Sequence, residues 1–307
     1  MMSRKQPWWE DSVWRLQALA YDVLLFLIRL LPIDAVSGLG GWLLRTFGPL
    51  SAPHRTARIN IDIAFPDAPA EWKKKLLADQ WENVGRTFFE LPILDRITAD
   101  KARVEVVNGE RLDQIRESGR AVVFISGHFA SWEVMPAVIV QRGVDCLITY
   151  RAQNNPYVDR RVVESRFRYG VRLFAPKGES ARELMEGMAE GKSVALMNDQ
   201  KFNSGLSAPL FGVPAMTAIG PTRYALRFDT VLQPMSVQRL HGAYFRVVVH
   251  DPIELAHTGD RKADVAAGVA KINAFMEERI RERPAEWFWV HRRWPKDIYR
   301  RDKPGSP

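Results

Sequence analysis

Short β-branched runs alternate with stretches of helical periodicity from residue 103 to the end of the chain, and this alternation limits the possible folds more than any other feature. The runs that predict strands are 121–125, 146–149, 194–197, 231–237 and 245–249. The stretches that predict helices are 156–169, 180–190 and 262–280. Strands that alternate with helices build a sheet with helices packed on it, so we predict an α/β fold.

The beginning of the chain is apolar and lacks this alternation. Residues 14–31 form an apolar stretch that Asp22 and Arg29 interrupt, and its longest clean run is only 23–28. A helix that spans a bilayer needs about 20 predominantly apolar residues. We therefore predict that this stretch lies in the membrane interface or enters it only shallowly. A helix buried in the protein core is the alternative, because short apolar runs also occur there.

Tryptophans near the start of the chain favour the membrane interpretation. Trp8, Trp9 and Trp14 suit the headgroup level of a bilayer, where an amphipathic indole ring is stable. We predict a helical membrane-anchoring segment in residues 1–50, followed by one α/β domain in residues 51–307. A chain of 307 residues is long enough to give such a domain a complete core.

The formal net charge of +8 and the pI near 9.7 indicate partners with negative charge, such as nucleic acid, an anionic membrane or an acidic protein. Nucleic-acid binding needs a recognisable element such as a helix-turn-helix, and we find none, so we predict no nucleic-acid partner. Cys146 is the only cysteine, which excludes an intrachain disulfide and a cysteine-based metal site. We predict a buried thiol there, and neither a metal nor a cofactor.

A histidine and a glutamate follow one of the predicted strands. A tight turn separates the strand 121–125 from His128, and the apolar run 136–140 predicts a helix after it. His128 is thereby placed at the carboxyl end of a strand, where the functional groups of open α/β sheets gather. If the first helical turn brings Glu133 to the imidazole, its carboxylate would fix the tautomer while the other nitrogen deprotonates an alcohol. A capping or core histidine beside an unrelated surface glutamate is the alternative.

Several motifs occur in an order that is more specific than any one of them. They are His128-Phe-Ala-Ser-Trp-Glu133, Thr149-Tyr-Arg-Ala-Gln-Asn-Asn-Pro156, Asn198-Asp-Gln-Lys201, Pro209-Leu-Phe-Gly-Val-Pro-Ala215 and Pro284-Ala-Glu-Trp-Phe-Trp-Val-His-Arg-Arg293. In these motifs the chain resembles the bacterial lipid A late acyltransferases, the lauroyl and myristoyl transferases of the glycerolipid acyltransferase superfamily. The first motif is that superfamily's His-x-x-x-x-Asp/Glu. The resemblance implies a mixed sheet flanked by helices, with an N-terminal membrane-anchoring helix.

The resemblance also implies a reaction. His128 as general base, with Glu133 as its carboxylate, would remove a proton from a hydroxyl of a lipid A precursor. The oxygen would attack the thioester of an acyl carrier protein donor directly, without a covalent acyl-enzyme. The implied place is the cytoplasmic face of the bacterial inner membrane. The implied partners are acyl carrier protein, the lipid A precursor and the membrane.

Three further residues are candidate substrate-binding groups. Arg151 follows a predicted strand at the same sheet edge as His128, where a guanidinium group can bind a phosphate or sugar oxygen through two hydrogen bonds. The superfamily's second motif has an arginine after a strand that is associated with the phosphorylated acceptor. A surface arginine paired with an aspartate is the alternative. Asp199 and Gln200 follow another predicted strand, and we predict that they line the site.

Basic clusters in 151–182 and 279–303 suit an acidic carrier protein, an anionic bilayer or a phosphorylated acceptor, although a solvated helix face would explain each one alone. Two other functions stay open. One is the same chemistry with a lysophospholipid or a glycosylated phosphoinositide as the acceptor. The other is a non-catalytic basic adaptor on the membrane, which would need neither His128 nor Glu133.

Overall fold

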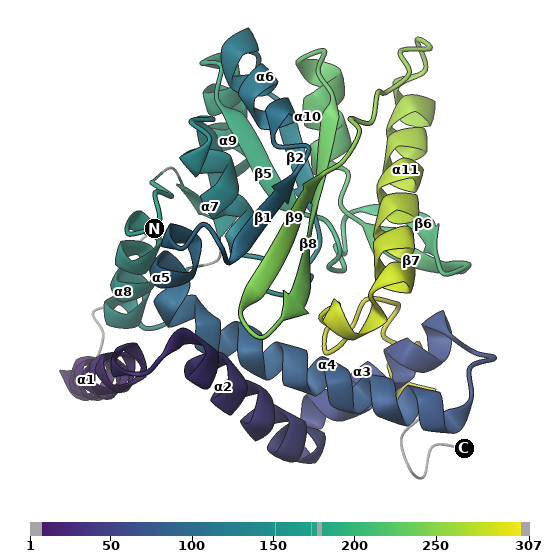
Figure 1. The fold of residues 1–307 in the computed structure, drawn as a ribbon. Helices are drawn as coiled ribbons and strands as arrows, with labels where there is room; N and C mark the ends of the chain where they lie inside the picture. Colours follow the sequence, from purple (N-terminus) through teal and green to yellow (C-terminus); the bar gives the residue numbers. More distant parts are fainter. Residues whose placement is uncertain (1–7, 151, 173, 177–179, 302–307) are drawn as a thin grey trace.

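A computed structural model describes residues 8–150, 152–172, 174–176 and 180–301 (Figure 1). Its centre is a seven-stranded sheet with the strand order β1-β9-β8-β2-β5-β3-β4. All neighbouring strands are parallel except β8 and β9. The strands are β1 (Val104–Val107), β2 (Val123–Ser126), β3 (Cys146–Tyr150), β4 (Phe174–Pro176), β5 (Ser193–Met197), β8 (Leu232–His241) and β9 (Tyr244–Val249), with a separate antiparallel pair, β6 (Leu206–Leu210) and β7 (Val213–Thr217).

Helices follow most of the strands of this sheet (Figure 1). They are α6 (Glu110–Ser118), α7 (Val134–Gln141), α8 (Pro156–Phe167), α9 (Ser180–Ala189), α10 (Gly220–Arg227) and α11 (Arg261–Glu282). Helix α7 contacts β3, β8 and β9, and α10 contacts β2 and β8. All four residues of β2 are buried, as expected for a parallel strand that is covered on both faces. The apolar run 121–125, which predicted this strand, therefore has a structural reason.

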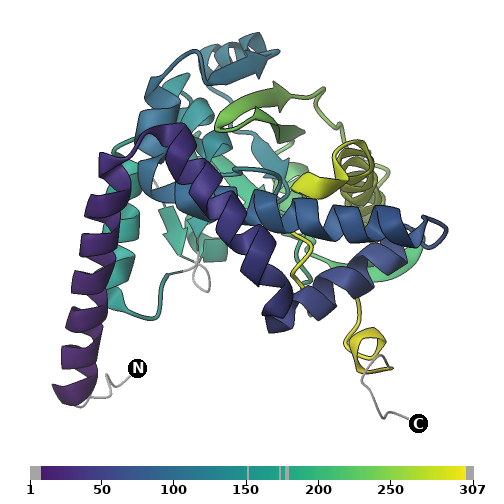
Figure 2. The same cartoon turned by 60° about the horizontal axis from the view of Figure 1, so that its bottom comes forward.

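The helices that precede the sheet lie along one end of it (Figures 1 and 2). They are α1 (Trp8–Leu30), α2 (Ile33–Phe47), η1 (Gly48–Leu50), α3 (Ala52–Ala64), α4 (Ala70–Glu90), η2 (Leu91–Ile93) and α5 (Leu94–Ala99). Glycines allow α2 and α4 to touch, because a Cβ atom at Gly85 would lie 2.0 Å from the carbonyl oxygen of Gly40. The domain boundary at residue 50 stays a prediction, and the contacts between α2 and α4 cross it.

Helices α1 and α2 expose large apolar side chains. On α1, Leu16, Phe26 and Leu30 are 68, 64 and 66 % exposed, and on α2 Trp42 is 59 % exposed. Helix α1 is therefore not the buried core helix of the alternative interpretation, although Ile28 on its other side is buried. Within the described ranges, none of the helices is long and apolar enough to cross a bilayer.

The prediction of an α/β fold is confirmed, with every predicted strand and helix at its predicted place. The sequence patterns missed β1, β4 and the antiparallel pair β6 and β7. Strand β4 has only three residues, which is too short for a periodic pattern to appear. Strand β1 has no fully buried residue and contains an exposed glutamate, Glu105, so it lacks the apolar run that marks the central strands.

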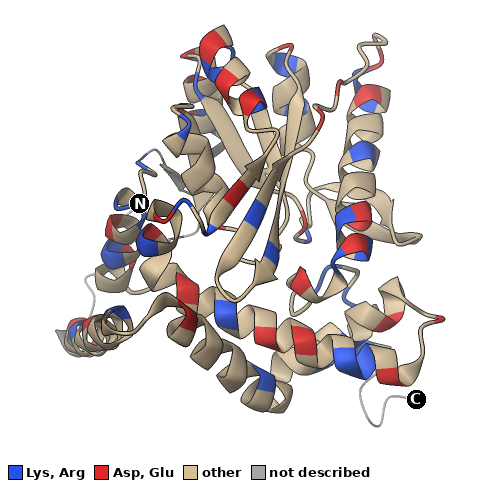
Figure 3. Cartoon of the chain, viewed as in Figure 1, with Lys and Arg blue, Asp and Glu red and all other residues tan. Residues whose placement is uncertain are grey.

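Acidic and basic residues lie together at the carboxyl-terminal end of α11 (Figure 3). The ion pairs there include Arg279–Glu282, Arg281–Glu277 and Arg283–Glu286. Paired charges on a solvated surface produce little net field. For this part of the 279–303 cluster, a solvated helix face describes the structure better than an unbalanced positive patch.

Candidate active site

The order of the strands brings two distant parts of the sequence together. Strands β2 and β5 are parallel neighbours, and Ser126 pairs with Met197 at their carboxyl ends. His128 lies two residues beyond β2, and Asp199 lies two residues beyond β5. The N–H of Asn198 donates to the carbonyl oxygen of Ser126 at 2.8 Å, which keeps the two segments together past the strand ends. His128 and Asp199 therefore meet at the carboxyl ends of β2 and β5, which is the edge of the sheet where we predicted the site.

Asp199 binds both the ring and the backbone of His128. One carboxylate oxygen lies 2.8 Å from Nδ1 of His128, and the other accepts the backbone N–H of His128 and the indole N–H of Trp287, each at 2.8 Å. Burial raises the pKa of the Asp199 carboxyl, but the charge of His128 and these hydrogen bonds outweigh burial and hold the pKa well below its ordinary value. An ionised Asp199 fixes Nδ1 as a donor, so Nε2 is the nitrogen suited to accept a proton.

The loop after β2 is held from two sides. Ala130 has a φ of 40°, a left-handed conformation that costs a non-glycine residue on the order of 1 kcal/mol. Its N–H donates to the carbonyl oxygen of Glu286, and its carbonyl oxygen accepts the Thr87 hydroxyl, both at 2.9 Å. The N–H of Phe288 donates to the carbonyl oxygen of His128 at 3.1 Å. These bonds keep the loop, and with it the imidazole, in one conformation.

Aromatic side chains surround the imidazole. The ring centroids of Trp132, His291 and Phe288 lie 5.0, 5.8 and 6.3 Å from that of His128. Phe88 of α4 packs on Trp132 and Phe288 and is 44 % exposed. Apolar walls beside a base limit the access of water and suit a hydrocarbon chain.

Glu133 lies in a different place from the one we expected. Its carboxylate accepts two hydrogen bonds from Arg166 of α8 and one from the hydroxyl of Tyr169 at 3.0 Å. The chain turns after Ala130, and α7 begins only at Val134, so no helical turn carries this carboxylate to the imidazole. Asp199, which we had placed among the substrate-binding residues, occupies that position instead.

Of the other two predicted substrate-binding residues, the structure describes Gln200 but not Arg151. Nε2 of Gln200 lies 3.1 Å from Nε2 of His291, so Gln200 reaches the site through the second histidine ring. Arg151 lies outside the described residues, and its role as a phosphate ligand stays a prediction. The structure therefore brings His128, Asp199 and Gln200 to one edge of the sheet.

Sequence comparisons identify the proteins that are similar to this chain. The family described as bacterial lipid A biosynthesis acyltransferase matches residues 12–296. The chain belongs to this family. It is 23 % identical to a lipid A biosynthesis palmitoleoyltransferase of Escherichia coli, over 78 % of this chain and 77 % of that one. A lipid A biosynthesis lauroyltransferase of the same organism is 23 % identical over 76 % of each chain. An acyltransferase of Haemophilus influenzae is 22 % identical over 83 % of this chain and 81 % of its own length.

Membership in the lipid A biosynthesis acyltransferase family makes this protein an acyltransferase. The motif 284–293 is part of the family resemblance, but we predicted no chemical role for its residues from the sequence. The motif supplies the Trp287 indole N–H, the Phe288 ring and the His291 ring to the site. A histidine beside aromatic residues was a usable signal, but only the fold shows that this segment pairs with the loop of His128.

The thiol of Cys146 lies in surroundings that do not activate it. Cys146 is buried in β3, and burial raises the pKa of its thiol well above the ordinary value, which makes it a poor nucleophile. Within the described ranges, no three His, Cys, Asp or Glu side chains gather in a way that would bind a metal ion.

Proposed function

We propose that this protein transfers a fatty acyl chain from an acyl carrier protein thioester to a hydroxyl of a lipid A precursor. The observation that carries the proposal is the hydrogen-bonded pair of His128 and buried Asp199 at the sheet edge, in a chain of this family. The palmitoleoyltransferase and lauroyltransferase to which the chain is similar are named for transfers of this kind.

His128 acts as the general base in this proposal. Its Nε2 takes the proton of the acceptor hydroxyl while the hydroxyl oxygen attacks the carbonyl carbon of the thioester. The charge of Asp199 stabilises the imidazolium that forms. When the tetrahedral intermediate collapses, the C–S bond breaks and the imidazolium returns the proton to the leaving thiolate. The ester forms in one transfer, and neither Cys146 nor any other side chain carries the acyl group.

The other predicted residues have supporting roles in this proposal. Glu133, bound to Arg166 and Tyr169, is a positioning residue that fixes the end of the loop of His128. Gln200 orients the His291 ring toward the substrate. Arg151 binds a phosphate or sugar oxygen of the acceptor.

The exposed apolar sides of α1 and α2 support a position at the membrane interface. Figure 2 shows α1 projecting from the rest of the chain. We place the catalytic part on the cytoplasmic face of the inner membrane because acyl carrier protein thioesters are cytoplasmic. Acyl carrier proteins are also acidic, which suits the net charge of +8.

A direct test uses the purified protein, an acyl carrier protein thioester and a lipid A precursor, with the product measured by mass spectrometry. His128→Ala should lower turnover roughly 10²–10⁴-fold, the usual contribution of a general base. His257→Ala is the matched control, because this histidine is 52 % exposed and lies outside the site. Near-normal turnover of His128→Ala would remove the proposed base.

The acceptor is tested in cells. Lipid A from cells with and without the gene should differ by the mass of one acyl chain. Identical lipid A in both strains, together with acyl transfer to a lysophospholipid by the purified protein, would show that the acceptor is a lysophospholipid. The assignment as an acyltransferase would still hold.

A further inference from the structure

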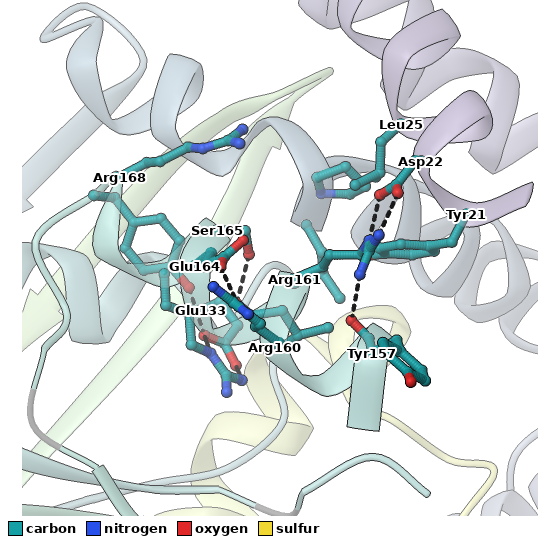
Figure 4. A pocket seen from close by; sticks show the side chains of 15 residues that line it. Tyr21, Asp22, Leu25, Glu133, Tyr157, Arg160, Arg161, Glu164, Ser165 and Arg168 are labelled. Carbon is teal, nitrogen blue, oxygen red and sulfur yellow. Dashed lines mark hydrogen bonds and ion pairs between the residues drawn. The ribbon is translucent and has the colours of Figure 1, made fainter. Parts of the chain in front are cut away.

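A cavity of about 470 Å³ lies between α1 and α8, and Figure 4 shows the side chains that line it. Its lining includes four arginines: Arg160, Arg161, Arg166 and Arg168. Glu133 also lines the cavity, five residues after His128 in the sequence. The cavity therefore extends from the N-terminal helix to the end of the loop that carries the proposed base.

Carboxylates pair with three of the four guanidinium groups, and two of these pairs join α8 to other segments of the chain. Arg161 forms an ion pair with Asp22 of α1 at 2.5 Å and also donates to the carbonyl oxygen of Tyr157. Arg166 is paired with Glu133, and both side chains are largely buried. These pairs hold α1 and the catalytic loop against α8. We therefore treat Arg161 and Arg166 as parts of the cavity wall.

The other two arginines have donors that face solvent or the cavity. Arg160 binds Glu164 through Nε alone, at 2.8 Å, and its side chain is 80 % exposed. Arg168 is exposed and forms no ion pair with any residue that the structure describes. The cavity lining holds four arginines but only three carboxylates, so it carries an excess of positive charge. A group with negative charge would balance this excess.

Helix α1 places the cavity beside the surface that we propose to contact the membrane. Tyr21, Asp22 and Leu25 of α1 line the cavity, whereas Phe26 and Leu30 are exposed on the same helix. A helix that lies in the interface has its polar side at the level of the lipid headgroups. The headgroup of a membrane lipid can therefore enter this cavity while its acyl chains stay in the bilayer.

We propose that this cavity binds a phosphate group on the headgroup of the acceptor glycolipid, an inference that rests on the proposed function. A phosphate oxyanion accepts hydrogen bonds from a guanidinium group in pairs, and Arg160 and Arg168 have the donors for such bonds. A sugar whose phosphate is held here lies next to the loop of His128. Inorganic phosphate has the same oxygens, so the test must separate a lipid phosphate from a free one.

The test measures binding of the full chain to detergent micelles that contain the lipid A precursor with or without its phosphate groups, in the absence of donor. The wild type should bind the phosphorylated precursor roughly tenfold more tightly, the size of a charge-assisted hydrogen bond at a partly solvated site. The double variant Arg160→Gln/Arg168→Gln should reduce this ratio toward one. Both side chains are exposed, so their replacement leaves the buried ion pairs in place.

Arg182→Gln is the matched control. Arg182 of α9 is 84 % exposed and pairs with Glu186 four residues later, as Arg160 pairs with Glu164, but it lies outside the cavity. This variant removes one positive charge, as each single replacement in the double variant does, and should keep the wild-type preference. An equal loss of preference in Arg182→Gln would show that only the net charge matters and would overturn the inference.

Acyl transfer to the two precursors, measured in the same samples, separates the inference from the proposed function. An unchanged phosphate preference in the double variant overturns the cavity as a phosphate site, even if acyl transfer to the precursor continues. Loss of the preference in the double variant supports the site, even if neither precursor is acylated and the proposed function fails. Inorganic phosphate is added to the bound protein at the same concentration as the glycolipid. If this releases the protein from the micelles, the assignment of the cavity to a lipid phosphate is overturned.

Discussion

Two carboxylates near His128 differ in what they touch, and this difference has a kinetic consequence. Asp199 binds Nδ1 of the imidazole, whereas Glu133 binds Arg166 and Tyr169. A negative charge in contact with an imidazole stabilises its protonated form and raises its pKa. Removal of that charge should therefore lower the pKa of the base. Removal of a charge that another residue already neutralises should leave the pKa of the base unchanged.

We expect Asp199→Asn to lower kcat and to shift the acidic limb of the kcat/KM profile to lower pH. Glu133→Gln should lower activity through KM or kcat without this shift, because its charge is matched by Arg166. The measurement is the pH dependence of kcat/KM for both variants and the wild type. A downward shift in Glu133→Gln but not in Asp199→Asn would assign the orienting role to Glu133, as we first expected from the sequence.

A second histidine should make the stability of the fold depend on pH. Nε2 of His250 lies 2.7 Å from the hydroxyl of Ser236. Burial, with Arg279 and Arg111 nearby, lowers the pKa of His250 to about 4, although Asp251 opposes this shift. The unfolded chain takes up a proton near pH 6.5, whereas the folded chain takes it up only near pH 4. The free energy of unfolding therefore falls as the pH decreases through this interval.

Between pH 7.5 and 5, this linkage should cost the wild type roughly 2 kcal/mol of stability. The measurement is urea unfolding at several pH values within this range. Most carboxylates titrate below it, so they contribute little. His250→Asn removes the titrating ring and should flatten the pH dependence even if it lowers stability at pH 7.5. An equally steep dependence in this variant would show that other groups cause it.

The candidate site was only partly predictable from its residues. His128 could be placed because a strand, a turn and a helix are local patterns, and local patterns are visible in a sequence. Its partner could not be identified, because Asp199 is 71 residues away and reaches His128 only through the adjacency of β2 and β5. Neighbouring strands are set by tertiary packing rather than by any local pattern. Glu133 was assigned by its nearness in the sequence, and a turn places it elsewhere.

At the scale of secondary-structure elements, the contact between α2 and α4 determines how the N-terminal helices join the sheet. A Cβ atom at Gly40 would lie 2.4 Å from the carbonyl oxygen of Gly85 and 2.6 Å from the ring of Phe89, so the helices would have to separate. Gly38, two residues earlier in the same helix, has open space around its Cβ position. Replacing each glycine by alanine therefore distinguishes the effect of close helix packing on stability from the effect of helix propensity.

We expect Gly40→Ala to lower the free energy of unfolding by roughly 1–3 kcal/mol, as overpacking of a tight contact does. Gly38→Ala should be neutral or should stabilise the helix by up to about 1 kcal/mol. Chemical denaturation of both variants provides the comparison. If both glycine replacements had the same effect, the close contact between α2 and α4 would not matter for stability.

The elements themselves were more predictable than their arrangement. Central strands such as β2 are buried on both faces and appear in the sequence as unbroken apolar runs. The long helix α11 carries its buried residues on one stripe, which a periodic pattern reveals. No sequence pattern could give the strand order, in which β9 and β8 separate β1 from β2. That order follows from long-range pairing.

For the whole molecule, the position of the exposed apolar surface relative to the cavity matters most. The apolar side of α1 and the arginine-lined cavity lie on different sides of one helix. A membrane contact through the apolar side would bring lipid headgroups to the cavity. Membrane attachment and acceptor binding would then depend on the same helix.

We expect the full chain to bind vesicles through this surface, and point substitutions test this better than a deletion that would disrupt the contact of α2 with α4. The triple variant Leu16→Gln/Phe26→Gln/Leu30→Gln replaces three exposed apolar side chains of α1 and should weaken sedimentation with vesicles at least tenfold, because each buried apolar side chain contributes about 1.5–3 kcal/mol. Ala20→Gln is the control, because it adds the same polar group to an exposed position of α1 without removing a large apolar one.

The choice of vesicles distinguishes apolar burial from simple charge attraction. The triple variant should bind more weakly than the wild type both to vesicles with anionic lipid and to vesicles without it. The substitutions leave the net charge at +8, so a loss of binding reports on the apolar contact and not on charge. Attachment through charge alone predicts the opposite, namely that the triple variant binds anionic vesicles as the wild type does and that salt releases both. That result would contradict the membrane contact of α1 and, with it, the delivery of a lipid headgroup to the cavity. Unchanged thermal unfolding of the variant would show that the exposed residues of α1 act on the membrane rather than on the fold.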